Sequence, residues 1–300
     1  AGAVALTDDG RPVENSLLMA RAMKEAASLG LRVVSHCEDL YLSQGGLMNE
    51  GAVSRELNVP GVPAASENAA TAREIALAES YGVPIHICHV STAVSAAMIR
   101  DAKKRGVQVT GETAPHYLLL TEEALRKKNA DWRMSPPLRT IQDQMAIKDA
   151  LVNGIFQTIG SDHCSFTFDD QKLKSRHDFT RIPGGIPGAE ERGIIAYDVL
   201  VNQCNMSVVD FMKLVSENPA KLYGMYPKKG TLAVGSDGDI TIVDKHIEHV
   251  LSKESAHTKA DYIPYEGISV TGKVRDVILR GHHVVQDGSL TESYLGECIP

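Results

Sequence analysis

The chain has 300 residues, of which 43% are hydrophobic, and a formal net charge of −7 at pH 7. This composition can bury the core of one large barrel or of two domains, and the acidic balance argues against nucleic acid as a partner. The apolar stretches are too short to span a bilayer, and the five cysteines are odd in number with no Cys-x-x-Cys pair. We therefore expect a soluble, cytoplasmic protein without a membrane partner.

Short apolar runs of strand length alternate along the chain with segments of helical periodicity. Five strands are predicted, in chain order, at residues 3–6, 31–35, 83–88, 107–110 and 154–159. Helices are predicted at residues 15–29, 67–81, 93–105, 121–128 and 140–153, with a Gly- and Pro-rich loop at 43–65. Such alternation is typical of parallel strands joined by crossover helices, so we predict an α/β fold with a (β/α)8 barrel of the TIM type. A doubly wound open sheet is the alternative, but no Gly-x-Gly-x-x-Gly follows the first strand.

The pattern changes after the fifth strand. A barrel needs eight strands and the chain opens inside an expected strand, so we expect N-terminal strands to be missing from this sequence. Residues 165–193 form a long loop rich in Gly and Pro, which we interpret as a lid or binding segment. Helices are predicted at 189–203 and 207–216. From residue 230 onward, alternation with Gly turns predicts a small antiparallel sheet outside the barrel.

Polar side chains gather where the expected strands end, at Asp9, His36, His89, Glu112 and Asp162. In a barrel these ends open onto one face, where catalytic sites are built. Two imidazoles and two carboxylates suit Zn²⁺ or a similar metal, which makes hydroxide available at neutral pH. We interpret Asp9, His36, His89 and Asp162 as metal ligands, with Asp9 suited to bridge two ions. Asp162 is also the expected acid/base residue, which takes a proton from the metal-bound water and returns one to a leaving nitrogen.

The neighbouring histidines and cysteines also have structural explanations. A single strand-end histidine is more often a hydrogen-bonded structural residue than a ligand. His86 stands three residues before His89, so on a regular strand the two face opposite ways and we expect His86 to pack among the helices. His116 and His163 are candidate neighbours of the site. Cys88, like the other cysteines beside the ligands, is expected to be a small buried packing residue.

Seven motifs, in chain order, are similar to those of one enzyme family. They are Thr7-Asp-Asp-Gly10, Ser35-His-Cys-Glu-Asp39, Met48-Asn-Glu-Gly-Ala52, His89-Val-Ser-Thr92, Glu112-Thr-Ala-Pro-His116, Pro136-Pro-Leu-Arg139 and Ser161-Asp-His163. Together they resemble the cyclic amidohydrolases of the amidohydrolase superfamily, which include dihydroorotase, dihydropyrimidinase, hydantoinase and allantoinase. The resemblance covers nearly the whole chain.

The resemblance implies a metal-dependent hydrolase that opens, or in reverse closes, a ring amide of a small cyclic substrate. It implies a barrel over residues 1–225, here partial, and a segment of a small β-sandwich domain over residues 226–300. By this resemblance His36 and His89 bind one metal ion, Asp162 binds the other, and a complete site holds two Zn²⁺ ions. Asp9 stands where dihydroorotases have a bridging aspartate, whereas hydantoinases use a carboxylated lysine further upstream. The family's His-x-His pair does not precede His36 in this sequence. A homo-oligomer, a dimer or tetramer, is the expected assembly.

Two parts of the sequence point to different branches of the family. The spacing of Asp9, His36 and His89 resembles dihydroorotase, the narrowly favoured activity, which interconverts dihydroorotate and N-carbamoyl-aspartate. Downstream, Ser135 and Phe166 stand where dihydroorotases typically have Asn and His, and the flanking motifs are similar to dihydropyrimidinases and hydantoinases. Phe cannot hydrogen-bond the substrate carboxylate that this His helps to hold.

These residues also define the alternatives. Ser135, Phe166 and Gly184 are the expected substrate contacts. A dihydropyrimidinase or hydantoinase is the first alternative to dihydroorotase. A non-catalytic scaffold protein related to dihydropyrimidinase is the second.

Overall fold

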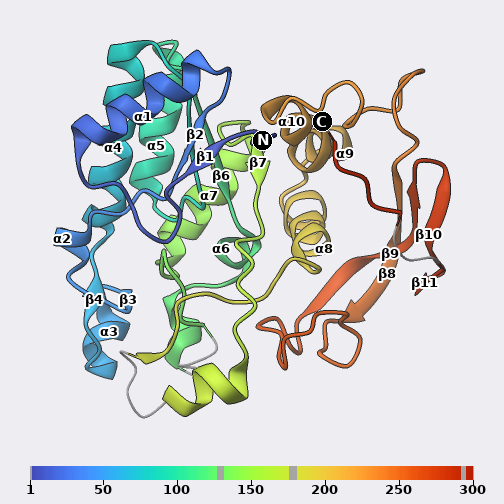
Figure 1. Cartoon of the computed structure of the whole chain (residues 1–300). Coiled ribbons are helices and arrows are strands. Elements are labelled where there is room, and N and C mark those ends of the chain that lie inside the picture. Colours follow the sequence, from blue (N-terminus) through green and yellow to red (C-terminus); the bar gives the residue numbers. More distant parts are fainter. Residues whose placement is uncertain (1, 127–131, 176–180, 292–294, 300) are drawn as a thin grey trace.

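The computed structural model describes residues 2–126, 132–175, 181–291 and 295–299, and a parallel sheet forms the centre of its larger part (Figure 1). The five strands of this sheet are β1 (Leu6–Thr7), β2 (Val33–Ser35), β5 (Ile85–Ile87), β6 (Val109–Thr113) and β7 (Thr158–Ile159). They lie side by side in chain order, and every pairing between neighbours is parallel. A doubly wound sheet would reverse its strand order, so the arrangement is a sector of a (β/α)8 barrel, as predicted.

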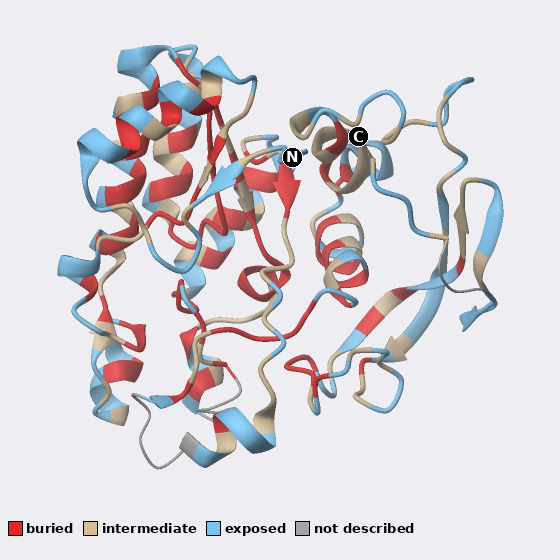
Figure 2. Cartoon of the chain, viewed as in Figure 1, coloured by how far each residue is buried: buried red, intermediate tan, exposed pale blue. Residues whose placement is uncertain are grey.

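Helices cover one face of this sheet. They are α1 (Ser16–Ser28), α4 (Ala64–Tyr81), α5 (Ala93–Lys104) and α7 (Ile141–Val152), close to the predicted ranges. Their buried residues face the sheet and their outer faces are exposed (Figure 2). The side chains of Thr92 and Thr140 cap α5 and α7 by accepting backbone N–H groups of the first turn, which explains why these helices begin where they do.

The segment predicted as a loop at 43–65 contains regular structure that the sequence did not indicate. It holds α3 (Ala52–Leu57) and a two-stranded parallel sheet of β3 (Met48–Asn49) and β4 (Gly61–Val62), and α2 (Leu40–Ser43) leads into it. A Cβ atom at Gly46 would lie 2.4 Å from the carbonyl oxygen of Gly61. The backbones therefore approach so closely that only glycine fits, and the same glycines that suggest a loop allow the compact packing.

The segment that follows β6 is also more structured than predicted. Pro115–Leu119 form α6, which the sequence did not indicate. Of the helix predicted at 121–128, the described part is a 3₁₀ turn, η1 (Glu122–Arg126), and the remainder lies outside the described residues. The expected lid begins with a π turn, η2 (Phe168–Lys172), and a 3₁₀ turn, η3 (Leu173–Ser175). Its role as a lid stays a prediction.

The helices predicted at 189–203 and 207–216 are present, and within each the hydrogen-bonding pattern changes from α to π. The first consists of α8 (Arg192–Tyr197) and a π-helical continuation, η5 (Asp198–Gln203). The second consists of α9 (Val208–Met212), η6 (Lys213–Glu217) and α10 (Asn218–Leu222). Among the described residues, no helix is both long and apolar enough to cross a membrane.

The predicted antiparallel sheet is confirmed, with its first strand starting later than the pattern suggested. Its strands are β8 (Ile240–Val250), β9 (Ser269–Leu279), β10 (His282–Gln286) and β11 (Ser289–Leu290), in the order β11-β10-β9-β8. It joins the barrel sector through β9: a Cβ atom at Gly272 would lie 2.9 Å from Ile194 of α8. Asp198 accepts a hydrogen bond from the backbone N–H of Thr271 at 3.1 Å. These contacts place the small sheet against the helices that follow the lid segment.

Candidate active site

Three of the predicted ligands meet where β1, β2 and β5 end. His36 Nδ1 lies 2.8 Å from His89 Nε2 and 3.1 Å from Asp9 Oδ1. His89 Nε2 lies 3.4 Å from the same Asp9 oxygen. Both histidines are buried, whereas 57% of the Asp9 side chain is exposed. The two nitrogens and the oxygen therefore form one group that opens to the surface at Asp9.

The backbone around this group is fixed by the carboxylate of Asp8, which was not among the predicted site residues. Asp8 accepts the N–H of His36 at 2.9 Å and that of Val13 at 2.8 Å, which ties the turn after β1 to the end of β2. His89 has a φ of 32°, a left-handed conformation that is uncommon for a residue other than glycine. Such strained residues persist where the surrounding structure holds them, often at functional sites.

The charges in the group are strongly coupled. His36 also contacts Glu38, with 3.1 Å between Nε2 and Oε2. Burial alone would lower the pKa of His36, but its bonds to Asp9 and Glu38 outweigh burial and raise the pKa to about 9. The same bonds from His36 and His89 hold the pKa of Asp9 well below its usual range. Without a metal ion, an imidazolium between two carboxylates is thus the stable state of His36.

The three ligand atoms fit a metal ion. Zinc binds nitrogen and oxygen ligands at about 2.0–2.2 Å in a tetrahedral arrangement, which separates neighbouring ligand atoms by roughly 3.4 Å. The distances of 2.8–3.4 Å among His36, His89 and Asp9 come close to this spacing. Asp9, His36 and His89 can therefore hold one cation with little rearrangement.

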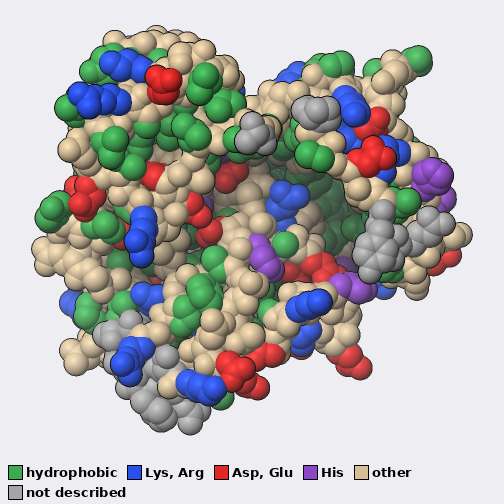
Figure 3. Space-filling view, in the orientation of Figure 1, with side chains coloured by type: hydrophobic (Ala, Val, Ile, Leu, Met, Phe, Trp, Pro, Cys, Tyr) green, Lys and Arg blue, Asp and Glu red, His purple; other side chains and the backbone are tan. Residues whose placement is uncertain are grey.

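Asp162 lies on the same cavity but outside the three-ligand group. A cavity of about 310 Å³ is lined by residues that include Asp9, His89, Glu112, Asp162 and Tyr223. Figure 3 shows that this side of the molecule is hollowed between the barrel sector and the C-terminal half. Asp162 has a φ of 49° and a side chain that is 17% exposed, and burial raises its pKa to about 6. A carboxyl group with this pKa can exchange protons near neutral pH.

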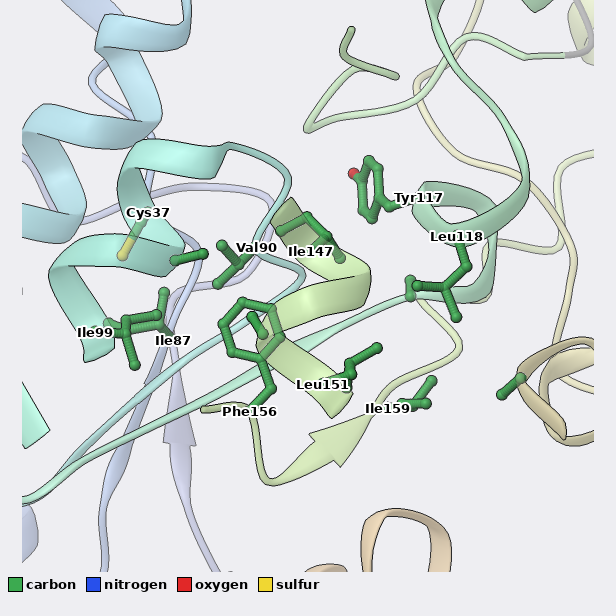
Figure 4. Packing of buried hydrophobic residues seen from close by; sticks show 14 of the residues in the cluster. Cys37, Ile87, Val90, Ile99, Tyr117, Leu118, Ile147, Leu151, Phe156 and Ile159 are labelled. Carbon is green, nitrogen blue, oxygen red and sulfur yellow. The ribbon is translucent and has the colours of Figure 1, made fainter. Parts of the chain in front are cut away.

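The prediction that His86 packs among the helices is wrong. The left-handed backbone of His89 breaks the alternation of β5, so a separation of three residues does not send the two histidines to opposite faces. Ile87 and Val90 are the residues that pack among the helices (Figure 4). His86 instead contacts Thr110 Oγ1 at 2.8 Å and Glu112 Oε2 at 3.4 Å, on the side of the sheet that faces the cavity.

The other candidate histidines have different surroundings. His116 is fully buried and its Nε2 lies 3.9 Å from Asp162 Oδ2, so it is a neighbour of the site. Burial lowers the pKa of His116 to about 3, and it is therefore neutral. His163 is exposed, and its Nδ1 accepts the N–H groups of Gly188 at 3.1 Å and Ala189 at 3.3 Å. It anchors the end of the loop that follows η3.

A model of the family described as "Amidohydrolase family" matches residues 1–284 of the chain. The chain belongs to the amidohydrolase family. It is 41% identical over 287 residues to the dihydroorotase of Syntrophus aciditrophicus (strain SB), and the match covers 96% of this chain and 66% of that protein. The dihydroorotase of Acetivibrio thermocellus is 40% identical over 287 residues, with the same coverage. The chain therefore spans slightly less than two thirds of the length of these curated relatives.

Solved structures with this fold carry other names. A crystal structure of a D-hydantoinase superposes with a TM-score of 0.87 at 36% identity and covers 97% of this chain and 65% of that one. A dihydropyrimidinase from Brevibacillus agri gives a TM-score of 0.85 at 35% identity and covers 96% and 65%. The resemblance to cyclic amidohydrolases predicted from the motifs is confirmed.

The three expected substrate contacts of this amidohydrolase come from three separate segments that lie near one another, and Ser135 is linked to His36 through Glu38. Ser135 Oγ lies 3.5 Å from Glu38 Oε2, the oxygen that contacts His36. Gly185, next to Gly184, donates its N–H to the carbonyl oxygen of Arg133 at 3.0 Å. A Cβ atom at Gly185 would lie 3.1 Å from the ring of Phe166. The arrangement brings them together, and their contact with substrate stays a prediction.

A buried charged network supports the amidohydrolase site from behind, and sequence reasoning missed it. Arg139 is 3% exposed; its guanidinium donates to Asn49 Oδ1 at 3.0 Å and to Ser91 Oγ at 3.1 Å. Glu67, also 3% exposed, accepts the N–H groups of Ser91 and Thr92, each at 3.1 Å. Asn49 and Arg139 belong to motifs quoted above, but nothing local in the sequence indicates that they meet.

Proposed function

We propose that this chain is the metal-binding part of a cyclic amidohydrolase, which hydrolyses a ring amide C–N bond or closes it in reverse. The observation that carries the proposal is the convergence of Asp9, His36 and His89, whose ligand atoms lie 2.8–3.4 Å apart. The relatives named dihydroorotase, D-hydantoinase and dihydropyrimidinase support this reaction class. Retention of all three ligand residues favours an enzyme over a non-catalytic scaffold protein.

The metal in this proposal is Zn²⁺, two ions per complete active site; Asp9, His36 and His89 would hold one ion, and Asp162 would be a ligand of the other. When bound, zinc would supply Lewis-acid chemistry, which polarises an amide carbonyl and lowers the pKa of water to about 7. Asp162 accepts the proton of the attacking water and then donates a proton to the leaving ring nitrogen. In the metal-free chain, burial raises the pKa of Asp162 to about 6. Glu38 holds the His36 ring so that Nδ1 points to the ligand group.

We propose dihydroorotase as the activity, with dihydroorotate and N-carbamoyl-aspartate as its reactants. The 40–41% identity to two proteins of that name and the place of Asp9 support this choice. Hydrolysis of dihydropyrimidines or hydantoins is the alternative, supported by the structural similarity to D-hydantoinase and by Phe166 at the expected substrate surface. Ser135, Phe166 and Gly184 contact the ring in either case.

A substrate panel tests this proposal. The complete natural protein, loaded with Zn²⁺, is assayed with dihydroorotate, N-carbamoyl-aspartate, dihydrouracil and hydantoin. We expect interconversion of the first two compounds and its loss in His89→Asn, whereas the surface control His282→Asn keeps it, because His282 is exposed on the C-terminal sheet. Hydrolysis of dihydrouracil or hydantoin without any reaction of dihydroorotate would favour the dihydropyrimidinase or hydantoinase alternative. Failure to hydrolyse any of the rings would overturn the proposal of a cyclic amidohydrolase.

Three organisational proposals accompany the activity. The barrel part ends near residue 225, in the connection between α10 and β8, and residues 226–300 belong to the small β domain. The protein acts in the cytoplasm, which the odd set of five free cysteines supports. It works as a homo-oligomer, a dimer or tetramer, and sedimentation of the complete protein tests this assembly.

A further inference from the structure

Two buried polar side chains beside the proposed active site each lack a partner that the other can supply. His116 on α6 is fully buried, and neither of its ring nitrogens has a hydrogen-bond partner among the described residues. The side chain of Asp162 is 17% exposed, and its one ion-pair contact in the part of the chain that the structure describes is His116, with 3.9 Å between Nε2 and Oδ2. Because burial of unpaired polar groups costs free energy, a bond between these two side chains is favoured.

The pairing of β6 with β7 sets the two residues side by side. Thr113 and Ile159 are register partners at the ends of these strands. Gly160 continues the pairing by donating its N–H to the carbonyl oxygen of Thr113 at 2.9 Å. His116 and Asp162 each stand three residues beyond the register partner on their own strand. The parallel sheet itself therefore brings the imidazole and the carboxylate together.

The short helix α6 supports the ring of His116 rigidly. The hydroxyl of Tyr117 donates to the carbonyl oxygen of Pro136 at 2.6 Å, and Tyr117 and Leu118 pack in the hydrophobic core (Figure 4). The side chain of Asp162 is less constrained, because rotation about the Cβ–Cγ bond of an aspartate has broad minima. A donor on a rigid support is therefore what fixes the plane of this carboxylate.

The charges decide which ring nitrogen of His116 carries the proton. Burial lowers the pKa of His116 to about 3, and the positive charge of His89 adds to this effect, so the ring is neutral and has a single N–H. A proton on Nε2 can be donated to the Asp162 carboxylate, once a movement of about 1 Å closes the gap of 3.9 Å. A proton on Nδ1 would instead be an unpaired buried donor and would turn the Nε2 lone pair toward the negative charge.

We propose that His116 is the positioning residue of Asp162: its Nε2–H donates to Oδ2 and leaves Oδ1 for the proton transfers of the proposed reaction. This inference rests on the acid/base role proposed for Asp162. Asp162 lines the cavity of about 310 Å³, whereas His116 does not, so His116 acts through the carboxylate and not on the substrate. Holding the carboxylate in one orientation presents the same oxygen for both transfers.

The tautomer of His116 tests the contact without metal and without substrate. In the metal-free complete protein with isotope-labelled histidine nitrogens, proton–nitrogen correlation spectra at pH 8 distinguish the two neutral tautomers, and loss of a signal in His116→Gln assigns it. We expect the Nε2–H form, with a proton resonance that moves upfield in Asp162→Ala. Asp101→Ala is the control and leaves it unchanged, because Asp101 is 51% exposed on α5 and pairs with Arg100. An Nδ1–H form, or a resonance that Asp162→Ala does not move, overturns the proposal.

Two substitutions of His116 test the consequence for the reaction. Gln places an amide N–H near the position of Nε2, whereas Leu fills similar space without a donor. In the zinc-loaded complete protein, His116→Leu should lower kcat by about 10–100-fold and change KM by less than about 3-fold, and His116→Gln should restore most of kcat. Circular dichroism checks the fold of both variants.

The kinetic outcomes separate positioning from a structural role. An unchanged kcat in His116→Leu, or an equal loss in the two folded variants, overturns the proposal. Failure of the wild-type protein to hydrolyse any ring would overturn the proposed function instead, and the tautomer spectra would still decide whether His116 donates to Asp162.

Discussion

Replacing Glu67 with Gln removes the charge from a carboxylate that holds the loop behind His89. Oε1 of Glu67 accepts the N–H groups of Ser91 and Thr92 and the hydroxyl of Thr92, each at 3.1 Å. Oε2 accepts the hydroxyl of Ser91 and lies 3.8 Å from the guanidinium of Arg139. The amide of Gln can supply one acceptor oxygen but presents N–H donors where Oε2 stood.

The structure gives the size of the expected effect. A hydrogen bond to a charged group contributes about 1.5–3 kcal/mol, and loss of one partner of a buried ion pair costs about 3–5 kcal/mol. Arg139 keeps its bonds to Asn49 and Ser91, so we take the lower range and expect Glu67→Gln to lose about 3 kcal/mol in the free energy of unfolding. The surface control Glu123→Gln, whose side chain is 62% exposed and pairs with Arg126, should lose at most about 1 kcal/mol.

Urea unfolding followed by circular dichroism measures both variants against the wild type. A shift in midpoint with an unchanged slope gives the difference in the free energy of unfolding. A loss of less than about 1 kcal/mol in Glu67→Gln would refute the reasoning, because the carboxylate would then contribute no more than an exposed pair. Zinc affinity of the same variant should also fall, since His89 lies two residues before the loop that Glu67 holds.

The remaining predictions concern the ligand group, the acid/base residue and the lid. The pKa of His36 is about 9, so zinc binding at pH 7 should release about one proton, measured by calorimetry in buffers of different ionisation enthalpy, and affinity should stop rising above about pH 9. Asp162→Asn should lower kcat by at least about 100-fold. It should also stabilise the metal-free protein by about 2–3 kcal/mol at pH 7, because a pKa raised from 3.8 to about 6 destabilises the fold above pH 6. That gain should vanish below about pH 4, and a gain independent of pH contradicts the argument. Gly185→Ala should cost about 2 kcal/mol or more, because φ is 138° and a Cβ atom would lie 2.6 Å from Cys164, whereas Gly193→Ala in α8 has open space and should not destabilise.

The parallel sheet and its helices were predictable because each helix is specified locally. Asn15, Thr92 and Thr140 cap helices at the predicted starts, and Gly82 ends α4 with a φ of 63°. The two-stranded sheet of β3 and β4 was not predictable, because its strands are two residues long and it depends on the close approach of two glycine backbones. A close contact between two glycine backbones leaves no repeating pattern of hydrophobic residues in the sequence.

The candidate site, like the fold, was only partly predictable from the sequence. Parallel strands end at one edge, which is why Asp9, His36 and His89 were expected to meet; the structure brings them together, and their role as ligands stays a prediction. The position of His86 was mispredicted because a single left-handed residue, His89, breaks the alternation on which the argument relied. Glu67 lies 24 residues from its partner Ser91 in the sequence. The hydrophobic pattern of a single strand or helix cannot indicate a contact over this separation.

Whether this amidohydrolase can bind the carboxylate of dihydroorotate depends on a residue other than Phe166. Arg133 precedes the expected contact Ser135 by two residues, and a Cβ atom at Gly184 would lie 2.9 Å from its Nη1. Its Nε is buried without a hydrogen-bond partner among the described residues, and Glu38, beside His36, lies close enough to raise its pKa against the effect of burial. The Nη1 end of this guanidinium, beside Gly184, can take over the carboxylate contact that a Phe cannot make.

Arg133→Met therefore separates the two candidate substrates. A hydrogen-bonded guanidinium–carboxylate contact contributes about 1.5–3 kcal/mol, so KM for dihydroorotate should rise by about 10–100-fold in the complete enzyme. Dihydrouracil has the same ring without the carboxylate, and any turnover of it should be unchanged. Equal losses for the two compounds would mean that Arg133 acts through the fold. An unchanged KM for dihydroorotate would leave its carboxylate without a partner in this part of the site, and Phe166 would then favour the uncharged rings.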